Sequence, residues 1–264
     1  MRNIVMLAEK WSCESQSFAE HSPVSKGFSA AAKTYSSHNV VQTICSSELI
    51  EGLNLQGNIV DLGAGPGTQY HVNPASSVLC LDVAFGMLSF LKSKFPSYSP
   101  INADAQSLPL LSESIDYIVS NLALQWCSDY KSAIDEAQRV LTHGGEIHLN
   151  LVANNSLPEL KALGFSVNQF RELSEYQQAF ETSNWKVLEV ELSKKVVYFS
   201  TLKELLYSIK GVGASVKFQN SDSQVQIRGR KDWDKLIKLS KQQTTKRGLP
   251  LTYEIVRIRA KKIG

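Results

Sequence analysis

The feature that most constrains the fold of this chain is a rhythm of short apolar runs and helical stretches in residues 1–151. A helical pattern from Asp129 to Leu141 and a Gly144-Gly145 turn separate the last two of these runs. Because uninterrupted apolar runs of this length are typical of strands buried on both faces, the alternation predicts βαβ units in an open, mostly parallel sheet. The runs are Asn58–Leu62, Ser77–Leu81, Ile115–Val119 and Glu146–Leu151.

The segments that flank this core show other patterns. Residues 1–26 are polar and mixed, which predicts a poorly ordered leader, and residues 28–50 have the apolar spacing of one or two helices. Asn154-Asn155-Ser156 is typical of a cap for a helix that begins near Pro158. We expect the later elements to be a polar helical stretch, a strand at Trp185–Phe199, a helix over 201–209 ended by Gly211 and Gly213, a basic helix within 228–247 and a last strand at Leu251–Ala260.

Composition narrows the class of protein. A chain of 264 residues with 43% hydrophobic residues can bury a sizeable core as one domain. The apolar run Ile4–Leu7 is too short for a signal peptide or a membrane span, so we expect a cytoplasmic protein without a membrane. The cysteines at positions 13, 45, 80 and 127 lack the close spacing of structural zinc sites, so we expect no metal.

Charge is divided unequally along the chain. Residues 1–150 carry 8 basic and 14 acidic side chains, whereas residues 151–264 carry 20 basic and 11 acidic ones. This asymmetry favours an acidic partner, because a basic face attracts anions over a Debye length of about 8 Å in physiological salt. A solvated lysine-rich surface is an equally acceptable interpretation.

A glycine loop, Asp61-Leu62-Gly63-Ala64-Gly65-Pro66-Gly67, follows the first predicted strand. The loop departs from the G-x-G-x-x-G spacing that cradles a pyrophosphate, and Pro66 removes one backbone donor. Asp61 would repel a phosphate and attract an ammonium or sulfonium group. The loop therefore favours S-adenosylmethionine (SAM) over a dinucleotide.

Two more acids lie at expected strand ends. Asp82, which comes 21 residues after Asp61, is placed to accept hydrogen bonds from a ribose diol, and Asp104 is placed to accept one from an adenine amino group. Each acid alone would more often be a helix cap or a loop residue, but the joint pattern favours a cofactor that carries a nucleoside. Met87 and Leu88 are candidates for an apolar face against the adenine.

This arrangement resembles the class I SAM-dependent methyltransferases over most of the chain. The resemblance implies an α/β, Rossmann-like fold with a seven-stranded, mostly parallel sheet whose last strand is antiparallel, plus helical lid or insertion elements. It implies SAM as the cofactor. The residues expected to bind it are Tyr35, His38, Asp61, Gly63, Ala64, Gly65, Gly67, Asp82, Val83, Met87, Asp104, Ala105, Asn121 and Leu122.

Five strings also resemble a narrower family, the malonyl-acyl-carrier protein O-methyltransferases of biotin synthesis. The chain differs from the expected pattern at Ala64, where we expect cysteine, at His143, where we expect proline, and in a longer leader. The strings are residues 28–42 with a helix that ends in Tyr35, residues 120–127, residues 155–160, residues 208–214 and residues 250–253.

The narrower resemblance implies methyl transfer from SAM to the free carboxylate of a malonyl thioester on acyl carrier protein. A carboxylic acid with a pKa of roughly 4 is already ionised at neutral pH, so no general base is needed. The residues expected at the reaction are positioning residues: Tyr35, Gln125, Trp126 and Lys210. Tyrosine or tryptophan packed in the core, and a lysine that only stabilises a helix end, are the structural alternatives, and Arg139 is an alternative partner for the carboxylate.

Under the same resemblance, the basic second half would dock the acidic carrier protein, with contacts drawn from Lys194, Lys195, Lys203, Arg228, Arg230 and Lys231. One alternative function is methylation of another small acid or a quinone-like acceptor. Another is RNA binding or methylation, which the lack of an Asn-Pro-Pro-Tyr-like string after the fourth predicted strand disfavours. We expect a single domain made of a leader (1–26), a helical cover (28–50), a SAM-binding core (58–151), lid and substrate elements (152–230), and a basic helix with the closing strand (231–264).

Overall fold

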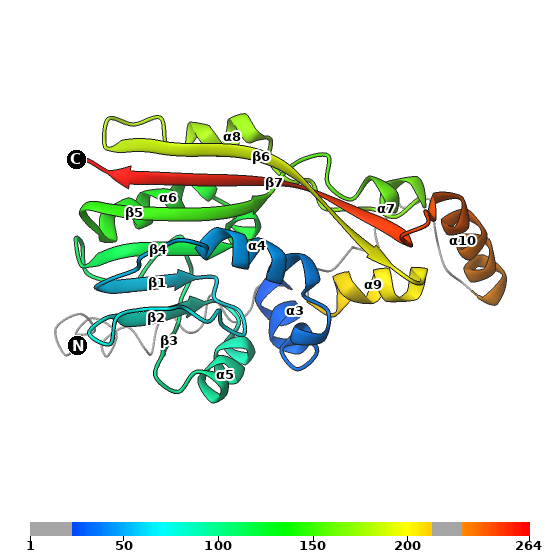
Figure 1. The fold of residues 1–264 in the computed structure, drawn as a ribbon, viewed down its shortest axis with the longest axis horizontal. Coiled ribbons are helices and arrows are strands. Elements are labelled where there is room, and N and C mark those ends of the chain that lie inside the picture. The colour runs from blue at the N-terminus through cyan, green and yellow to red at the C-terminus, as the bar shows by residue number, and fades with distance from the viewer. Residues whose placement is uncertain (1–22, 213–228) are drawn as a thin grey trace.

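The computed structural model describes residues 23–212 and 229–264 (Figure 1). Some of the predictions above refer to residues 1–22, Gly213 or Arg228, which lie outside the described residues. The strands are β1 (Asn58–Leu62), β2 (Ser77–Asp82), β3 (Ser99–Asn102), β4 (Ile115–Asn121), β5 (Leu141–Val152), β6 (Trp185–Phe199) and β7 (Leu249–Lys262). The helices are α3 (Pro23–Ala31), α4 (Val40–Ile50), α5 (Phe85–Lys94), α6 (Tyr130–Val140), α7 (Pro158–Ala162), α8 (Leu173–Gln178), α9 (Leu202–Lys210) and α10 (Arg230–Gln243), with short 3-10 helices η1 (Tyr35–Ser37) and η2 (Leu124–Trp126).

All seven strands form one sheet in the order β3-β2-β1-β4-β5-β7-β6. The pairs from β3 to β5 are parallel, and β7 runs antiparallel to both β5 and β6. The predicted mostly parallel sheet with an antiparallel last strand is therefore confirmed. Because the strand order reverses between β1 and β4, the carboxyl ends of these strands border the crevice in which open sheets bind ligands.

Helices cover both faces of the sheet. The helices α6 and α8 pack Ile134, Ala137 and Tyr176 against one face, where they join the largest cluster of buried side chains. On the other face, Leu49 of α4 and Leu91 of α5 pack against β1 and β2. This two-sided burial explains why the central strands are continuously apolar in sequence.

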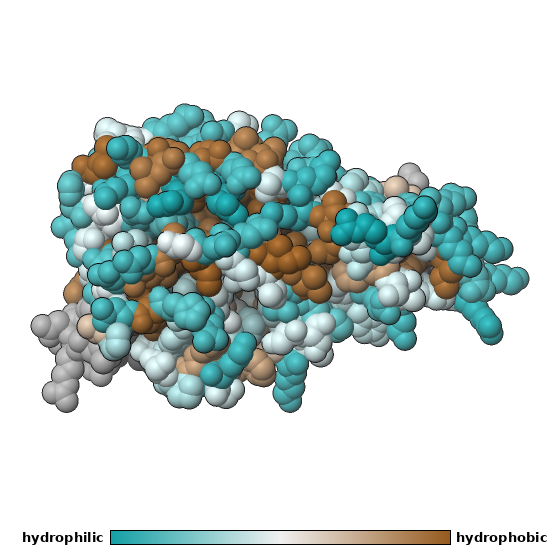
Figure 2. Space-filling view, in the orientation of Figure 1, coloured by the Kyte–Doolittle hydropathy of each residue, from teal (hydrophilic) through white to brown (hydrophobic). Residues whose placement is uncertain are grey.

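The paired strands β6 and β7 extend well beyond the rest of the sheet, and α7, α9 and α10 surround this extension (Figure 1). A separate cluster of buried side chains holds it together, including Leu160 of α7, Leu205 of α9 and Leu236 of α10. Figure 2 shows a mainly hydrophilic surface over α10 at the tip of the extension. Helix α10 carries five basic residues, so part of the basic charge of the second half lies at this end of the molecule: Arg230, Lys231, Lys235, Lys238 and Lys241.

Three local predictions are wrong. Helix α3 includes Pro23 to Lys26, which the sequence analysis assigned to a poorly ordered leader. The Gly144-Gly145 pair lies inside β5, where a register shift against β4 accommodates it. The predicted cap does not precede α7, since Leu157 in a left-handed conformation occupies the N-cap and the Ser156 hydroxyl donates to the Ala153 carbonyl at 2.7 Å.

Two further findings concern the described residues as a set. Within 23–212 and 229–264, no helix is long and apolar enough to cross a bilayer. The same ranges contain no group of three or more histidine, cysteine, aspartate or glutamate side chains arranged to hold a metal ion.

Candidate active site

Two adjoining cavities lie at the carboxyl ends of β1, β2 and β4. The first, which we call the strand-end cavity, has a volume of about 310 Å³ and is lined by residues that include Gly65, Asp82 and Asp104. The second, the loop cavity, has a volume of about 260 Å³ and runs along the glycine loop past Asp61 and Gly67. Tyr35, Gly63 and Asn121 line both cavities.

The glycine loop folds back tightly onto β2. Gly63 has φ +73°, and a Cβ built on it would lie 2.1 Å from the Cβ of Ala123. The amides of Gly63 and Ala64 donate to the Leu81 carbonyl at 2.7 and 3.0 Å. Glycine is therefore required at position 63 both for the turn and for the close approach of the segment after β4.

Asp82 connects the loop to the next helix. Its Oδ2 accepts a hydrogen bond from the Gly65 amide at 2.8 Å, and its Oδ1 accepts one from the Ala84 amide at 2.8 Å. Burial raises the pKa of Asp82, and these two hydrogen bonds oppose the rise. The carboxylate is thus fixed in orientation at the mouth of the strand-end cavity, with lone pairs left to accept further bonds.

Asp61 is the most perturbed acid of the site. It is 3% exposed, and its Oδ2 has no hydrogen-bond partner among the described residues. Burial raises the pKa of Asp61 to about 7, although hydrogen bonds from the Tyr70 hydroxyl and the Thr68 backbone oppose the rise. An unpaired buried carboxylate oxygen at the wall of a cavity is suited to accept from a cationic ligand.

Asp104 lies two residues beyond β3 and also lines the strand-end cavity. Gln106 donates to both of its carboxylate oxygens, from Nε2 at 3.0 and 3.1 Å. The Oε1 of Gln106 in turn accepts from the amide of Asp129, which caps α6. Gln106 itself lines the cavity, and no signal in the sequence separated it from an ordinary loop residue.

The structure gathers most of the residues that the sequence analysis proposed for the cofactor. His38 is the exception, because its ring packs against Gly211 and lies 6.2 Å from the Tyr207 ring, outside both cavities. Lys210 is exposed and lines neither cavity. The proposed cofactor residues that line one or both cavities are Tyr35, Asp61, Gly63, Ala64, Gly65, Gly67, Asp82, Val83, Met87, Asp104, Ala105, Asn121 and Leu122.

A third, smaller cavity, which we call the apolar cavity, adjoins the strand-end cavity and has a volume of about 60 Å³. Trp126 forms part of the wall between the two, with its ring edge-on to Phe28 at 5.6 Å and to Phe170 at 6.2 Å. Gln125 lines the apolar cavity and donates from Nε2 to the Leu122 carbonyl at 2.6 Å. The residues shared by the strand-end and apolar cavities are Phe28, Tyr35, Leu122 and Trp126.

Two asparagines attach α4 to the sheet beside these cavities. Asn121 Nδ2 donates to the Gln42 carbonyl at 2.9 Å, and Asn150 Nδ2 donates to the Cys45 carbonyl at 2.8 Å. The two side chains are also bonded to each other, from Asn150 Nδ2 to Asn121 Oδ1 at 3.1 Å. Helix α4, and with it Gln42, is therefore fixed relative to the ends of β4 and β5.

Arg139 has a structural role rather than a place at the site. Its guanidinium pairs with Glu136 at 2.7 Å and donates to the carbonyls of Leu108 and Leu110 at 2.9 and 2.8 Å. These bonds secure the segment before β4 to α6. The alternative role of Arg139 as partner of an acceptor carboxylate has no support in this geometry.

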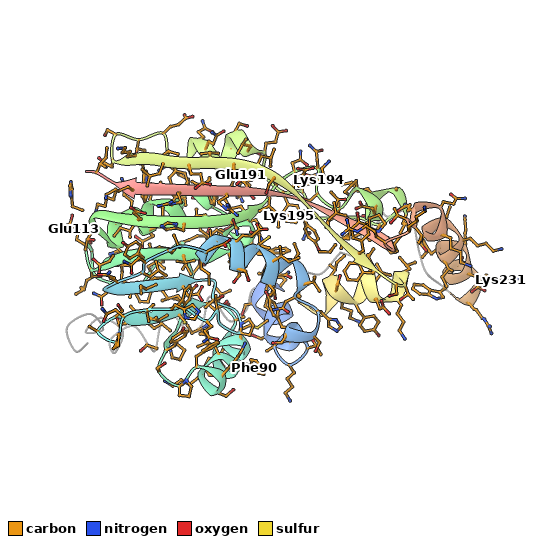
Figure 3. All side chains as sticks on the ribbon, in the orientation of Figure 1. Phe90, Glu113, Glu191, Lys194, Lys195 and Lys231 are labelled. Atoms are coloured by element: carbon orange, nitrogen blue, oxygen red, sulfur yellow. The ribbon has the colours of Figure 1, made fainter. Side chains whose placement is uncertain are left out.

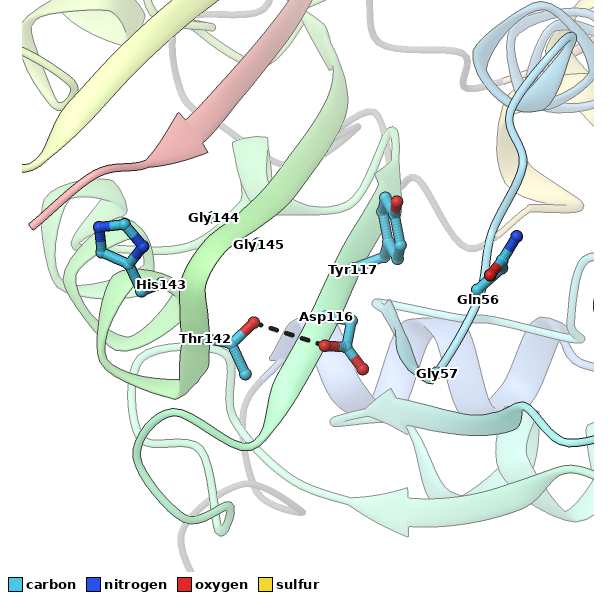
Figure 4. Close-up of a pocket in the computed structure, with 8 residues that line it drawn as sticks. All are labelled: Gln56, Gly57, Asp116, Tyr117, Thr142, His143, Gly144 and Gly145. Carbon is cyan, nitrogen blue, oxygen red and sulfur yellow. Dashed lines mark hydrogen bonds between the residues drawn. The ribbon is translucent and has the colours of Figure 1, made fainter.

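An open hollow of about 350 Å³ lies at the opposite edge of the sheet, at the amino ends of β1, β4 and β5 (Figure 4). Figure 4 shows Asp116 bonded to Thr142 there, with His143 turned away from that pair. None of the residues proposed for cofactor or acceptor binding lines it. In a sheet of this kind ligands are expected to bind at the carboxyl ends of the strands, so we assign the functional site to that edge and not to this hollow.

The sheet topology, the glycine loop and the acids after the strands define a class I SAM-dependent methyltransferase. Residues 60–149 match the family model described as a methyltransferase domain. A malonyl-acyl-carrier protein O-methyltransferase from Hamiltonella defensa is 32% identical over 244 residues, which are 88% of this chain and 92% of that protein. The chain belongs to the malonyl-acyl-carrier protein O-methyltransferase family.

Other similar proteins agree with this family and fold. A malonyl-acyl-carrier protein O-methyltransferase from a Marinomonas species is 27% identical over 88% of this chain and 90% of that protein. The biotin biosynthesis bifunctional protein BioHC of Cellvibrio japonicus is 29% identical over 88% of this chain, which spans about half (48%) of that longer protein. Among solved structures, a SAM-dependent methyltransferase from Thermotoga maritima has a TM-score of 0.54 at 15% identity, covering 90% of this chain and 99% of that one, which shows the fold alone.

Proposed function

We propose that this protein transfers the methyl group of SAM to the free carboxylate of malonyl-acyl carrier protein. The product would be a neutral methyl ester that chain elongation can treat as an ordinary apolar chain end, as a precursor for biotin. The names of the relatives support this assignment, and their identities of 27–32% extend over most of the chain.

One observation on this chain carries the proposal further. The five strings that resemble the family are separated by up to 225 residues in sequence, yet each contributes side chains to the apolar cavity. A cavity that adjoins the proposed SAM site and collects all five strings is the natural place for the acceptor. The contributing residues, in chain order, are Phe28, Tyr35, Val41 and Gln42; Leu122, Gln125 and Trp126; Leu157; Ile209 and Val212; and Tyr253.

The residues of the two larger cavities fit SAM. The unpartnered Oδ2 of Asp61 suits the ammonium group, and Asp82 retains lone pairs for the ribose diol. Met87 is 1% exposed and lines the strand-end cavity, where it offers an apolar surface to the adenine. When bound, SAM would supply an electrophilic methyl group on a sulfonium.

The chain's own contribution to the reaction is positioning and exclusion of water. The acceptor carboxylate is already ionised at neutral pH, so no side chain has to remove a proton. Trp126, Phe28 and Leu122 border the passage between the strand-end and apolar cavities and would keep bulk water from the reacting oxygen. Tyr35 lines all three cavities and is therefore the residue best placed to contact both donor and acceptor.

The proposed docking surface for the carrier protein is revised by the ion pairs. Lys195 is bonded to Glu48 at 2.7 Å, so it is less available than the sequence suggests. Lys194 is 62% exposed and lies 3.5 Å from Glu254, and Lys231 projects from α10 at the tip of the extension (Figure 3). Lys203, Arg230 and Lys231 are the cations of the proposed pool that we expect to dock the acidic carrier.

The test incubates the purified protein with labelled SAM and either malonyl-acyl carrier protein or malonyl-coenzyme A, and follows label into methyl ester. We expect transfer to both and a lower KM for the carrier form. If SAM binds but neither substrate is methylated, the acceptor assignment is wrong and only the SAM site stands.

A further inference from the structure

The apolar cavity raises a question of chemistry, because the proposed acceptor is an anion. Among the described residues that line the cavity there is no lysine, arginine or histidine. Lys210, the cation that the sequence analysis favoured for the carboxylate, is exposed and lies outside the lining. Any recognition of the carboxylate by these residues has to come from neutral donors.

Two tyrosines of the cavity have phenol groups that are free to donate. Neither Tyr35 nor Tyr253 forms a hydrogen bond through its hydroxyl with another described residue, and both line the cavity. Burial raises the pKa of Tyr35 and of Tyr253 well above the ordinary value of 10.0, so both phenols keep their protons. Both side chains are half-buried, so their hydroxyls can donate to a ligand in the cavity without giving up a bond to another described residue.

Gln42 is a further polar residue of the cavity lining. Its Oε1 is buried without a hydrogen-bond partner among the described residues, and its backbone is held by Asn121 as described above. A carboxamide can rotate to present its amino group, which has two donor hydrogens. Gln125 differs, because its amide is already committed to the Leu122 carbonyl.

We propose that the acceptor carboxylate is recognised by neutral hydrogen-bond donors, the phenols of Tyr253 and Tyr35 with the Gln42 amide, and not by a cation of residues 23–212 or 229–264. This inference rests on the proposed function and adds the groups that select the anion. Hydrogen bonds to a charged carboxylate are roughly twice as strong as those to a neutral ester. The site therefore favours the ionised substrate over its methyl ester product, while leaving the negative charge that attacks the methyl group unneutralised.

The experiment measures binding of malonyl-acyl carrier protein and of its methyl ester to the wild-type protein and to Tyr253→Phe, both saturated with S-adenosylhomocysteine. Carrier docking is common to the two ligands, so the ratio of their Kd values reports on the carboxylate alone. We expect Tyr253→Phe to reduce the preference for the free acid by about 10-fold or more, in line with loss of one hydrogen bond to a charged group. The Kd for SAM should stay unchanged, which verifies that the variant is folded.

Two further variants make the result specific. Tyr198→Phe is the matched control, since Tyr198 lies on β6 with its ring against Arg247 at 4.3 Å and does not line the cavity. Lys210→Ala tests the competing cation. The proposal predicts an unchanged ratio of Kd values for both of these variants.

The outcomes separate the two levels of inference. If Tyr253→Phe keeps the wild-type ratio, or if Lys210→Ala abolishes the preference, the neutral-donor proposal is overturned while the methyltransferase function stands. If the wild-type protein binds SAM but neither binds nor methylates malonyl-acyl carrier protein, the proposed function itself is wrong and this inference falls with it.

Discussion

Asp61 provides the sharpest test of the proposed SAM site, because its burial should make the ligand-free protein less stable at high pH. In the unfolded chain the carboxyl group titrates at its ordinary pKa of 3.8, whereas burial raises the pKa in the folded protein to about 7. The folded state therefore binds the proton more tightly, and stability falls as the pH rises from about 4 to about 7 and stays constant above that.

The size of the effect follows from this pKa difference. At about 1.4 kcal/mol for each pKa unit, ionised Asp61 costs the fold up to roughly 4 kcal/mol above pH 7. Asp61→Asn removes the charge and keeps an oxygen that can accept from the Tyr70 hydroxyl, but it adds an amide N–H without a partner, which costs about 1–3 kcal/mol. We expect the ligand-free variant to be more stable than wild type at pH 8 by about 1–3 kcal/mol.

Urea denaturation at several pH values checks this prediction. The difference in free energy of unfolding between variant and wild type should be about 3 kcal/mol smaller at pH 5 than at pH 8, because the wild-type penalty shrinks as Asp61 takes up a proton. Asp135→Asn is the control, since Asp135 is half exposed in a pair with Lys131 and should change stability by less than about 0.5 kcal/mol.

The same substitution should have the opposite effect on ligand binding. If the Asp61 carboxylate accepts from the ammonium of SAM, the variant should bind SAM about tenfold more weakly or worse, and wild-type affinity should fall about tenfold for each pH unit below 7. A variant that is less stable than wild type at pH 8, or a stability difference that is equal at pH 5 and pH 8, would refute the reasoning about Asp61.

The remaining predictions concern the loop and the docking surface. Gly63→Ala should destabilise the fold by about 3 kcal/mol or more and abolish SAM binding, because the new methyl group would lie 2.1 Å from the Cβ of Ala123. Gly52→Ala is the control, since Gly52 has a similar φ of +72° and nothing within 4 Å of the added methyl group. This control should cost only about 1–2 kcal/mol in thermal or urea unfolding. For the carrier substrate, KM should rise steeply with salt concentration. The double variant Lys203→Glu/Lys231→Glu should raise KM at low salt and flatten its salt dependence without changing kcat. A KM that is insensitive to salt would exclude the electrostatic docking surface.

The strands and the strand-end acids could be predicted because each depends on local pattern. The runs at β1 and β2 are continuously apolar since both faces of these strands are covered, whereas buried and half-buried residues alternate along much of the antiparallel β7. A parallel sheet then brings the carboxyl ends of its strands to one edge, so Asp61 and Asp82 come together without further information.

Other features depended on contacts that no local pattern records. Gly144 and Gly145 have the composition of a turn, yet they lie inside β5 at the register shift against β4, between the paired residues Leu141 and Glu146. His38 follows Tyr35 by three residues, which suggests a shared face, but η1 is too short to continue as a helix and the His38 ring instead fills the space that Gly211 leaves open. The place of Tyr253 in a cavity has no local signal, because a tyrosine on a closing strand has the pattern of any partly buried strand residue.

The donor and acceptor sites differ in where their information lies. The proposed SAM cavities lie at the carboxyl ends of neighbouring strands in a fold that is shared with a solved structure at 15% identity, so this part of the site follows from the fold and says little about the substrate. The apolar cavity instead takes its side chains from α3, η1, α4, η2, β5, α9 and β7 and from the loops between elements, which only the whole fold brings together. Substitutions at the family-string residues that line the apolar cavity alone should therefore change the KM for the acceptor while leaving SAM affinity intact. These residues are Val41, Gln125, Leu157, Ile209, Val212 and Tyr253.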